Sequence, residues 1–238
     1  MIDRRLPCPA STLVAALATA FLPSPSSAAN CSDNSGVTTC TLSGTYTVAQ
    51  PFWMGASPVN PTEFTSSAVI TATPSSSTEG GLQVVVQGGN GNSSNLTGGD
   101  TQGLTLTNSG NITLQSSSGI TFNGEFYGLN ARQQGGNAIS EHSDGGNGGV
   151  AGRKLDQIVS LTNHADIHLD VQGLSLMHGS GAAISAVSKG GVGAVASNGK
   201  GGAGGQAVGA QVDNTGNVTA KLGGGGRFAG IQAISLGG

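Results

Sequence analysis

The sequence predicts an all-β protein, a right-handed parallel β-helix (a solenoid) with an N-terminal cap and glycine-rich inserts. A segment with an asparagine turn occurs three times, a second phrase follows each copy, and apolar and polar residues alternate in both. Self-similarity at a regular period is typical of solenoids and repeat arrays. Alternation with a period of two is typical of strands that bury one face. We therefore expect short strands stacked in successive coils.

The repeated segment begins with an asparagine at a turn and continues into an alternating strand. Its three copies contain TNSGNITL, TNHADIHL and DNTGNVTAKL, and their asparagines are Asn108, Asn163 and Asn214. Asparagine hydrogen-bonds within its own turn and tolerates left-handed backbone, and glycine does so without steric cost. Each copy is therefore interpreted as a strand, an asparagine turn and a second strand.

A second phrase follows each copy at a similar distance. It reads GLNARQQGG from Gly128, AISAVSKGG from Ala183 and GIQAISLGG from Gly230. Because about 20 residues supply three short strands with their turns, we expect about two coils in each repeat. On that count the three asparagines occupy equivalent corners without touching, so no asparagine ladder is expected.

The composition fits stacked coils better than a globular core of large rings. Of 238 residues 42 are Gly, aromatic residues make up 4% and charged residues 9%, whereas average glycine usage is about 7%. Disordered chains usually carry a high net charge, but here it is only −3. Coils need only small and aliphatic residues inside. The sparse charge also excludes the basic stripe of a nucleic-acid-binding protein.

Residues 1–29 are predicted to be a secretory signal peptide. Arg4 and Arg5 precede an apolar run over residues 11–22, and small residues precede a cleavage site at Asn30. The alternative is a membrane anchor, but an apolar run of about 12 residues is shorter than the roughly 20 that a span needs. We expect the export machinery to carry the chain to the periplasm, cell surface or medium, with no transmembrane span in the mature chain.

Cys31 and Cys40 remain after this cleavage and predict a disulfide, as an even pair does in a secreted chain. Closing so small a loop contributes about 2–3 kcal/mol on the chain-entropy model. A metal site is the alternative, but no histidine lies within 100 residues of the pair. We expect residues 30–100 to form an N-terminal cap and the first coils, and residues 101–238 to form the β-helical repeats.

Three aromatic residues, Phe52, Trp53 and Phe64, stand out in the region before the repeats. The end coil of a solenoid exposes its stacking face and needs a cover. We interpret these residues as part of that cap. A patch that stacks on a sugar is the alternative.

Two glycine-rich inserts, residues 135–154 and 190–209, separate the repeats. Both begin at the double glycine that closes the second phrase, so we expect them to project from one corner of the solenoid. Insertions in repeat proteins often form a binding face. The alternative is that they are spacers or low-complexity drift.

No catalytic, cofactor or metal site is predicted. His164 matches Ser109 and Thr215, and His168 matches Thr113 and Thr219, which indicates interchangeable surface positions rather than zinc ligands. The remaining histidines are His142 and His178. One aspartate, Asp144, lies in a stretch that resembles calcium-binding repeats, which require several copies in phase.

The carboxylates do not form a pair that the sequence places for acid–base chemistry. One of them, Asp166, recurs as a polar position, replaced by Asn111 and Asn217 in the other copies. The carboxylates considered are Glu125, Glu141, Asp144, Asp156, Asp166, Asp170 and Asp213.

These motifs together resemble the N-terminal passenger region of proteobacterial autotransporters. The resemblance is carried by residues 31–47, by the three asparagine turns and by the closing phrase of residues 228–238. It implies export, passage through a C-terminal outer-membrane β-barrel and display at the cell surface, commonly as an adhesin. No strands of a barrel follow the repeats, so we expect this chain to be truncated before the barrel.

The sequence therefore predicts a secreted or surface-displayed passenger segment that is not an enzyme and that works as a stalk or adhesin. Its ligand on a host or cell surface is not specified by the sequence. One alternative is a β-helical polysaccharide lyase or depolymerase, which needs carboxylates clustered on adjacent coils. Another is a haemagglutinin-like filament exported by two-partner secretion.

Overall fold

The computed structural model describes residues 29–55, 60–74, 80–92, 96–117, 119–122, 124–141, 144–176, 180–195 and 201–238. In this part of the chain the regular elements are all strands, which confirms the prediction of an all-β fold. The predicted signal peptide lies outside the described residues, except for Ala29. No helix in the described residues is long and apolar enough to cross a membrane.

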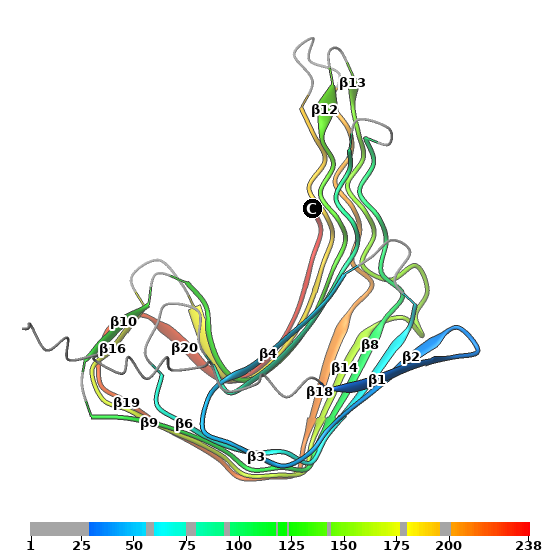
Figure 1. The fold of residues 1–238 in the computed structure, drawn as a ribbon. Coiled ribbons are helices and arrows are strands. Elements are labelled where there is room, and N and C mark those ends of the chain that lie inside the picture. Colours follow the sequence, from blue (N-terminus) through cyan, green and yellow to red (C-terminus); the bar gives the residue numbers. More distant parts are fainter. Residues whose placement is uncertain are drawn as a thin grey trace, which may run out of the picture.

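Three parallel sheets form the body of the molecule, and the chain adds one strand to each sheet in every pass (Figure 1). The first sheet contains β2 (Val37–Leu42), β5 (Thr62–Ser66), β8 (Leu104–Asn108), β14 (Val159–Asn163) and β18 (Ala210–Asn214). The second contains β3 (Thr45–Tyr46), β6 (Val69–Ala72), β9 (Ile112–Ser116), β15 (Ile167–Val171) and β19 (Val218–Leu222). The third contains β4 (Gln50–Gly55), β7 (Leu82–Gln87), β11 (Phe126–Gln134), β17 (Ser180–Lys189) and β20 (Arg227–Leu236).

Smaller elements complete the body and its projection. β1 (Asn30–Asn34) pairs antiparallel with β2 at the edge of the first sheet. β10 (Ile120–Phe122) and β16 (Leu174–Leu176) pair in parallel between the second and third sheets. β12 (Ser140–Glu141) and β13 (Asp144–Gly145) form a short antiparallel pair far from the body (Figure 1).

One repeat is one pass of the chain, which corrects the expected count of two coils. Asn108 pairs in register with Asn163, and Asn163 with Asn214. The residues that follow each asparagine, up to the end of the second phrase, form one strand of the second sheet and one strand of the third. The rest of the repeat leaves the body after the third sheet and returns to the first, so its length adds no further coil.

The core lies between the three sheets and is largely aliphatic. Leu106 and Leu161 pair in register and are fully buried, and Ile112 and Ile167 repeat this arrangement in the second sheet. Alternate residues of a strand point to opposite faces, which explains why the alternating segments become strands. Burying one such side chain contributes about 1.5–3 kcal/mol. The core is therefore built from rows of similar residues that run across the passes.

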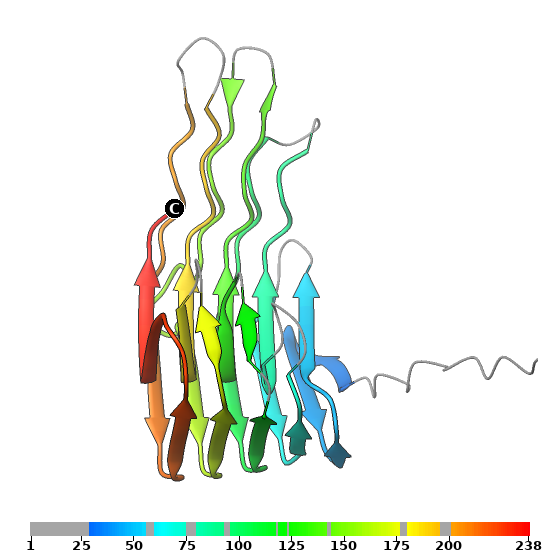
Figure 2. The ribbon, with the colours of Figure 1, turned by 90° about the vertical axis from the view of Figure 1, so that its left-hand side faces the viewer.

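The glycine-rich segments project together from one corner of the body, and we call this projection the tongue (Figures 1 and 2). In the second, third and fourth passes an outgoing segment follows the third sheet and a returning segment leads to the first, and the fifth pass contributes the start of an outgoing segment. The outgoing segments are residues 88–92, 135–141, 190–195 and 237–238, and the returning segments are residues 96–101, 144–152 and 201–208.

Backbone hydrogen bonds hold the tongue together, with a period of three residues. The amides of Gly88 and Gly91 donate to the carbonyls of Gln134 and Asn137 at 2.9 and 2.8 Å. A second set of backbone hydrogen bonds alternates between outgoing and returning segments. It runs through Gly99, Gly136, Gly149, Gly191, Gly205 and Gly238. In this series the amide of each glycine donates to the carbonyl of the glycine named before it. A three-residue period without internal bonds matches polyproline II geometry.

The close packing of these segments requires glycine. A Cβ at Gly149 would overlap the carbonyl oxygen of Gly99, and one at Gly136 would overlap that of Gly89. Glycine is the residue that permits such an approach of two backbones. The inserts are therefore not interchangeable spacers, because their double glycines are fixed by packing.

Candidate functional site

The three asparagines of the repeat form a ladder, contrary to the expectation that they do not touch. Asn108 Nδ2 donates to Asn163 Oδ1 at 2.8 Å, and Asn163 Nδ2 donates to Asn214 Oδ1 at 2.7 Å. Each Nδ2 also donates to the carbonyl two residues further on and so closes its own turn. Asn108 and Asn163 are fully buried. Buried polar groups need such partners, so the asparagines hold neighbouring passes in register.

The two described histidines of the repeats occupy the polar positions that the sequence predicts. His164 Nδ1 lies 3.0 Å from Thr215 Oγ1. His168 pairs in register with Thr113 and Thr219. His142 and His178 lie outside the described residues. Among the residues that the structure describes, no three His, Cys, Asp or Glu side chains gather to hold a metal ion.

Asp166 belongs to a second ladder on the outside of the same turn. Its amide donates to Asn111 Oδ1 at 3.1 Å, and its Oδ1 accepts from both nitrogens of Asn217 at 3.0 Å. The predicted equivalence of these three positions is confirmed. The side chains of Glu141 and Asp144 lie outside those described, so the structure does not test the likeness of this stretch to calcium-binding repeats.

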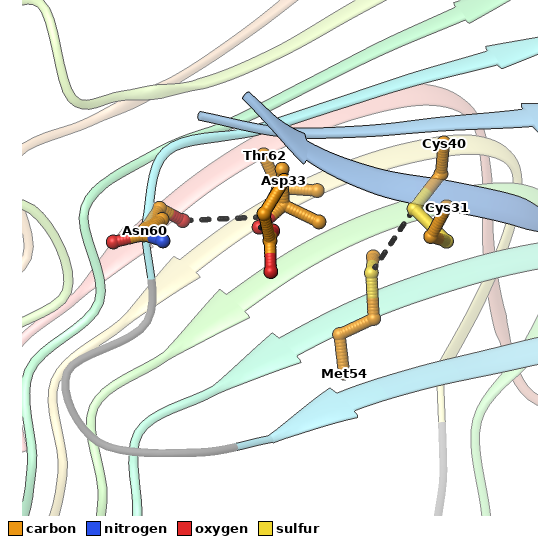
Figure 3. Close-up of a disulfide and its surroundings, with 7 residues drawn as sticks. Cys31, Asp33, Cys40, Met54, Asn60 and Thr62 are labelled. Atoms are coloured by element: carbon orange, nitrogen blue, oxygen red, sulfur yellow. Dashed lines mark hydrogen bonds between the residues drawn. A yellow bond between two sulfur atoms is a disulfide. The ribbon is translucent and has the colours of Figure 1, made fainter. Parts of the chain in front are cut away.

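Cys31 and Cys40 form a disulfide between β1 and β2, with an S–S distance of 2.09 Å (Figure 3). The two residues pair directly across the antiparallel strands. Cys40 is fully buried, and its sulfur lies 3.7 Å from Met54 Sδ on β4. The bridge therefore fastens the antiparallel edge strand to the first pass.

The three aromatic residues assigned to the cap separate in the structure. Phe64 is 1% exposed in the core, and Phe52 packs against it with ring centroids 5.1 Å apart. Trp53 points to the opposite face of β4 and is 67% exposed. Two of the rings thus belong to the core, whereas the indole is left free for contact with a ligand.

A groove of about 490 Å³ lies beside this indole on the outer face of the third sheet. Its floor consists of two rows of residues that are in register across β4, β7 and β11. One row is Trp53, Val85 and Arg132, and the other is Pro51, Gln83 and Asn130. Glu125 and Tyr127 complete the end of the groove near β11.

Charged and phenolic groups at the β11 end form a connected network. Arg132 Nη1 donates to Glu125 Oε2 at 3.0 Å, and Nη2 donates to Gln134 Oε1 at 2.9 Å. The side chains of Glu125 and Ser185 lie close enough to Tyr127 to influence the pKa of its phenol. Burial, and then the negative charge of Glu125, raise the pKa of Tyr127 to about 12. The phenol therefore stays protonated at neutral pH.

The raised pKa gives this tyrosine a defined effect on stability. Because its pKa is higher in the folded chain than the ordinary value of about 10, the folded state holds the proton more tightly. The resulting stabilisation is complete below pH 10 and is lost as the pH rises towards 12.

Two polar atoms of the groove residues are buried without a hydrogen-bond partner among the described residues. They are Asn130 Oδ1, an acceptor, and Arg132 Nε, a donor. Asn130 is only 2% exposed. Buried polar atoms are ordinarily paired, and two more unpaired atoms in the described part of the chain, Thr101 Oγ1 and Gln133 Oε1, belong to residues that do not line the groove.

Sequence reasoning considered Trp53 as a stacking residue only in its alternative interpretation and missed the rest of the groove. Glu125 was considered among the carboxylates, but no sequence motif indicates that it pairs with Arg132. Comparison with known proteins finds no matching family model, no similar curated protein and no similar solved structure. The function is therefore argued from the fold and the groove.

Proposed function

We propose that this chain is a right-handed parallel β-helix of an autotransporter-type passenger, exported and working as a non-enzymatic stalk or adhesive surface. The observation that carries the proposal is the stacking of equivalent residues in register through successive passes, including the asparagine ladder. Such stacking makes a scaffold whose outer faces carry rows of repeated side chains.

Two further features support the proposal. Connections between parallel strands of one sheet are right-handed in about 98% of cases, which favours a right-handed coil. The disulfide between Cys31 and Cys40 favours an oxidising compartment, because such bonds persist mainly in exported proteins.

Export is tested by expressing the full chain in a Gram-negative host and determining the compartment and N-terminus of the product. We expect a periplasmic product that begins at Asn30, with the disulfide formed and a β-type far-UV circular dichroism spectrum. The matched variant Ala29→Arg blocks cleavage and leaves a product that begins at Met1. A reduced, uncleaved wild-type chain in the cytoplasm contradicts the proposal.

Adhesion is tested separately with beads coated with the purified product. We expect these beads to bind cultured cells several-fold better than beads coated with the heat-denatured product. Equal binding by the two kinds of beads contradicts an adhesive role.

A further inference from the structure

We propose that the groove on the outer face of the third sheet binds a neutral saccharide, with Trp53 as its stacking platform. This inference goes beyond the proposed function and does not depend on export. It commits to one ligand class, and three features of the groove support it: an exposed indole, the dimensions of the floor and two buried polar atoms without partners among the described residues.

The exposed indole supplies a flat apolar surface. Trp53 is 67% exposed on a strand whose neighbouring side chain, Phe52, packs in the core. Ligand pockets combine aromatic walls with a few placed polar groups and have volumes of about 300–1,000 Å³. The groove has about 490 Å³ and contains both kinds of group. The face of a pyranose ring carries C–H groups and matches such an aromatic surface.

The dimensions of the floor suit a sugar ring. Trp53 and Arg132 are in register with the same residue, Val85, on the strand between them. Two strand spacings separate Trp53 from Arg132 by about 9.5 Å, and the two rows lie about 6.7 Å apart along the strands. A pyranose stacked beside the indole therefore brings its hydroxyl groups to the polar end of the groove.

The polar end contains one unpaired acceptor and one unpaired donor. Asn130 Oδ1 accepts and Arg132 Nε donates, and neither has a partner among the described residues. A hydroxyl group both donates and accepts, so the hydroxyl groups of a sugar suit both an unpaired acceptor and an unpaired donor. An apolar ligand leaves both atoms unpaired, which is costly for buried groups.

The charge balance selects a neutral sugar over an acidic one. The guanidinium of Arg132 already bonds Glu125 and Gln134 through its two terminal nitrogens. Glu125 offsets the positive charge, so an added carboxylate gains little attraction and meets a like charge. We therefore expect a neutral hexose chain to bind more tightly than a uronic acid chain.

The groove carries its own probe, because Trp53 is the single tryptophan of the chain. Fluorescence of the purified full chain is titrated with cellohexaose, maltohexaose and mannohexaose, and with hexagalacturonate as the anionic comparison. We expect a saturable change in emission with at least one neutral chain, at an affinity about tenfold higher than for hexagalacturonate. No change with any of the three neutral chains, or tighter binding of hexagalacturonate, overturns the proposal.

Variants connect the signal to the proposed contacts, with binding measured by calorimetry. Trp53→Ala, at an exposed position that leaves the fold intact, is expected to weaken binding about tenfold or more. Asn130→Ala should weaken it about fivefold to tenfold through the lost acceptor. Leu155→Ala, at an 87% exposed position outside the groove, serves as the control. Unchanged affinity in Trp53→Ala overturns the proposal even where Asn130→Ala fails to fold.

Discussion

The body and the tongue belong to the same passes of one chain, yet they are held together by opposite means. In the body, side chains such as Leu106 and Leu161 fill the space between sheets. In the tongue, the backbone of Gly149 contacts that of Gly99 with no room for any side chain. The body therefore depends on apolar side chains, whereas the tongue depends on their absence.

This difference has consequences for stability. Apolar burial contributes about 1.5–3 kcal/mol for each large side chain, whereas one backbone hydrogen bond contributes a net of about 0.5–1.5 kcal/mol. Glycine also loses more conformational entropy on folding than other residues. We infer that the tongue is the weaker unit and opens locally while the body stays folded.

Leu161→Ala is expected to have the largest effect on stability, because it removes a fully buried side chain from the middle of a row of core residues. Core truncations of leucine cost about 2–5 kcal/mol, and chemical denaturation should show this loss as an earlier transition. Leu155→Ala, at an exposed position, is the control and should stay within about 0.5 kcal/mol of the wild type. Equal stability of the two variants contradicts the assignment of the core.

Asn163→Ala is expected to cost about 2–3 kcal/mol, since the loss of several buried hydrogen bonds is only partly additive. The substitution breaks the ladder on both sides and leaves Asn214 Oδ1 without its donor. The comparison variant is Asn217→Ala on the exposed outer ladder, which should cost less because water replaces its partners. A larger loss for Asn217→Ala contradicts a structural role for the inner ladder.

Gly149→Ala separates the two regions most directly. Because its methyl group overlaps backbone atoms, we expect a local cost of about 1–3 kcal/mol. Hydrogen exchange should lose protection in the tongue but not in β14 or β15. Gly230→Ala, where a Cβ meets no atom within 4 Å, is the matched control. Loss of protection throughout the body contradicts the independence of the two regions.

The sequence predicted the body well because its pattern is local. Alternation predicted the strands, and the position of Asn108 predicted the turn between β8 and β9. The number of coils was wrong, because the length of each repeat includes an excursion into the tongue. Local spacing does not distinguish a second coil from an out-and-back segment, so the asparagine ladder was missed with it.

The projection of the inserts from one corner was predicted and is confirmed (Figure 1). The backbone packing within the tongue and the groove were both missed, for different physical reasons. The tongue had a signal, the triplets of two glycines and a polar residue at 88–90, 98–100 and 135–137. Such triplets indicate close contacts between backbones, which a search for side-chain patterns does not detect. The groove had no such signal, because register brings Trp53 and Arg132 together from strands of different passes.

Arg153→Ala is expected to have the smallest effect, although it removes an ion pair at the base of the tongue. The guanidinium contacts the carboxylate of Asp100, but its side chain is 69% exposed. Exposed pairs contribute about 0–1 kcal/mol. Asp100 also accepts the amide of Val150 at 2.7 Å, and this bond remains in the variant. Asp100→Asn keeps the acceptor and removes the charge, so thermal unfolding should rank both variants close to the wild type. A loss as large as that of Gly149→Ala in either variant means that charge, rather than backbone packing, holds the tongue.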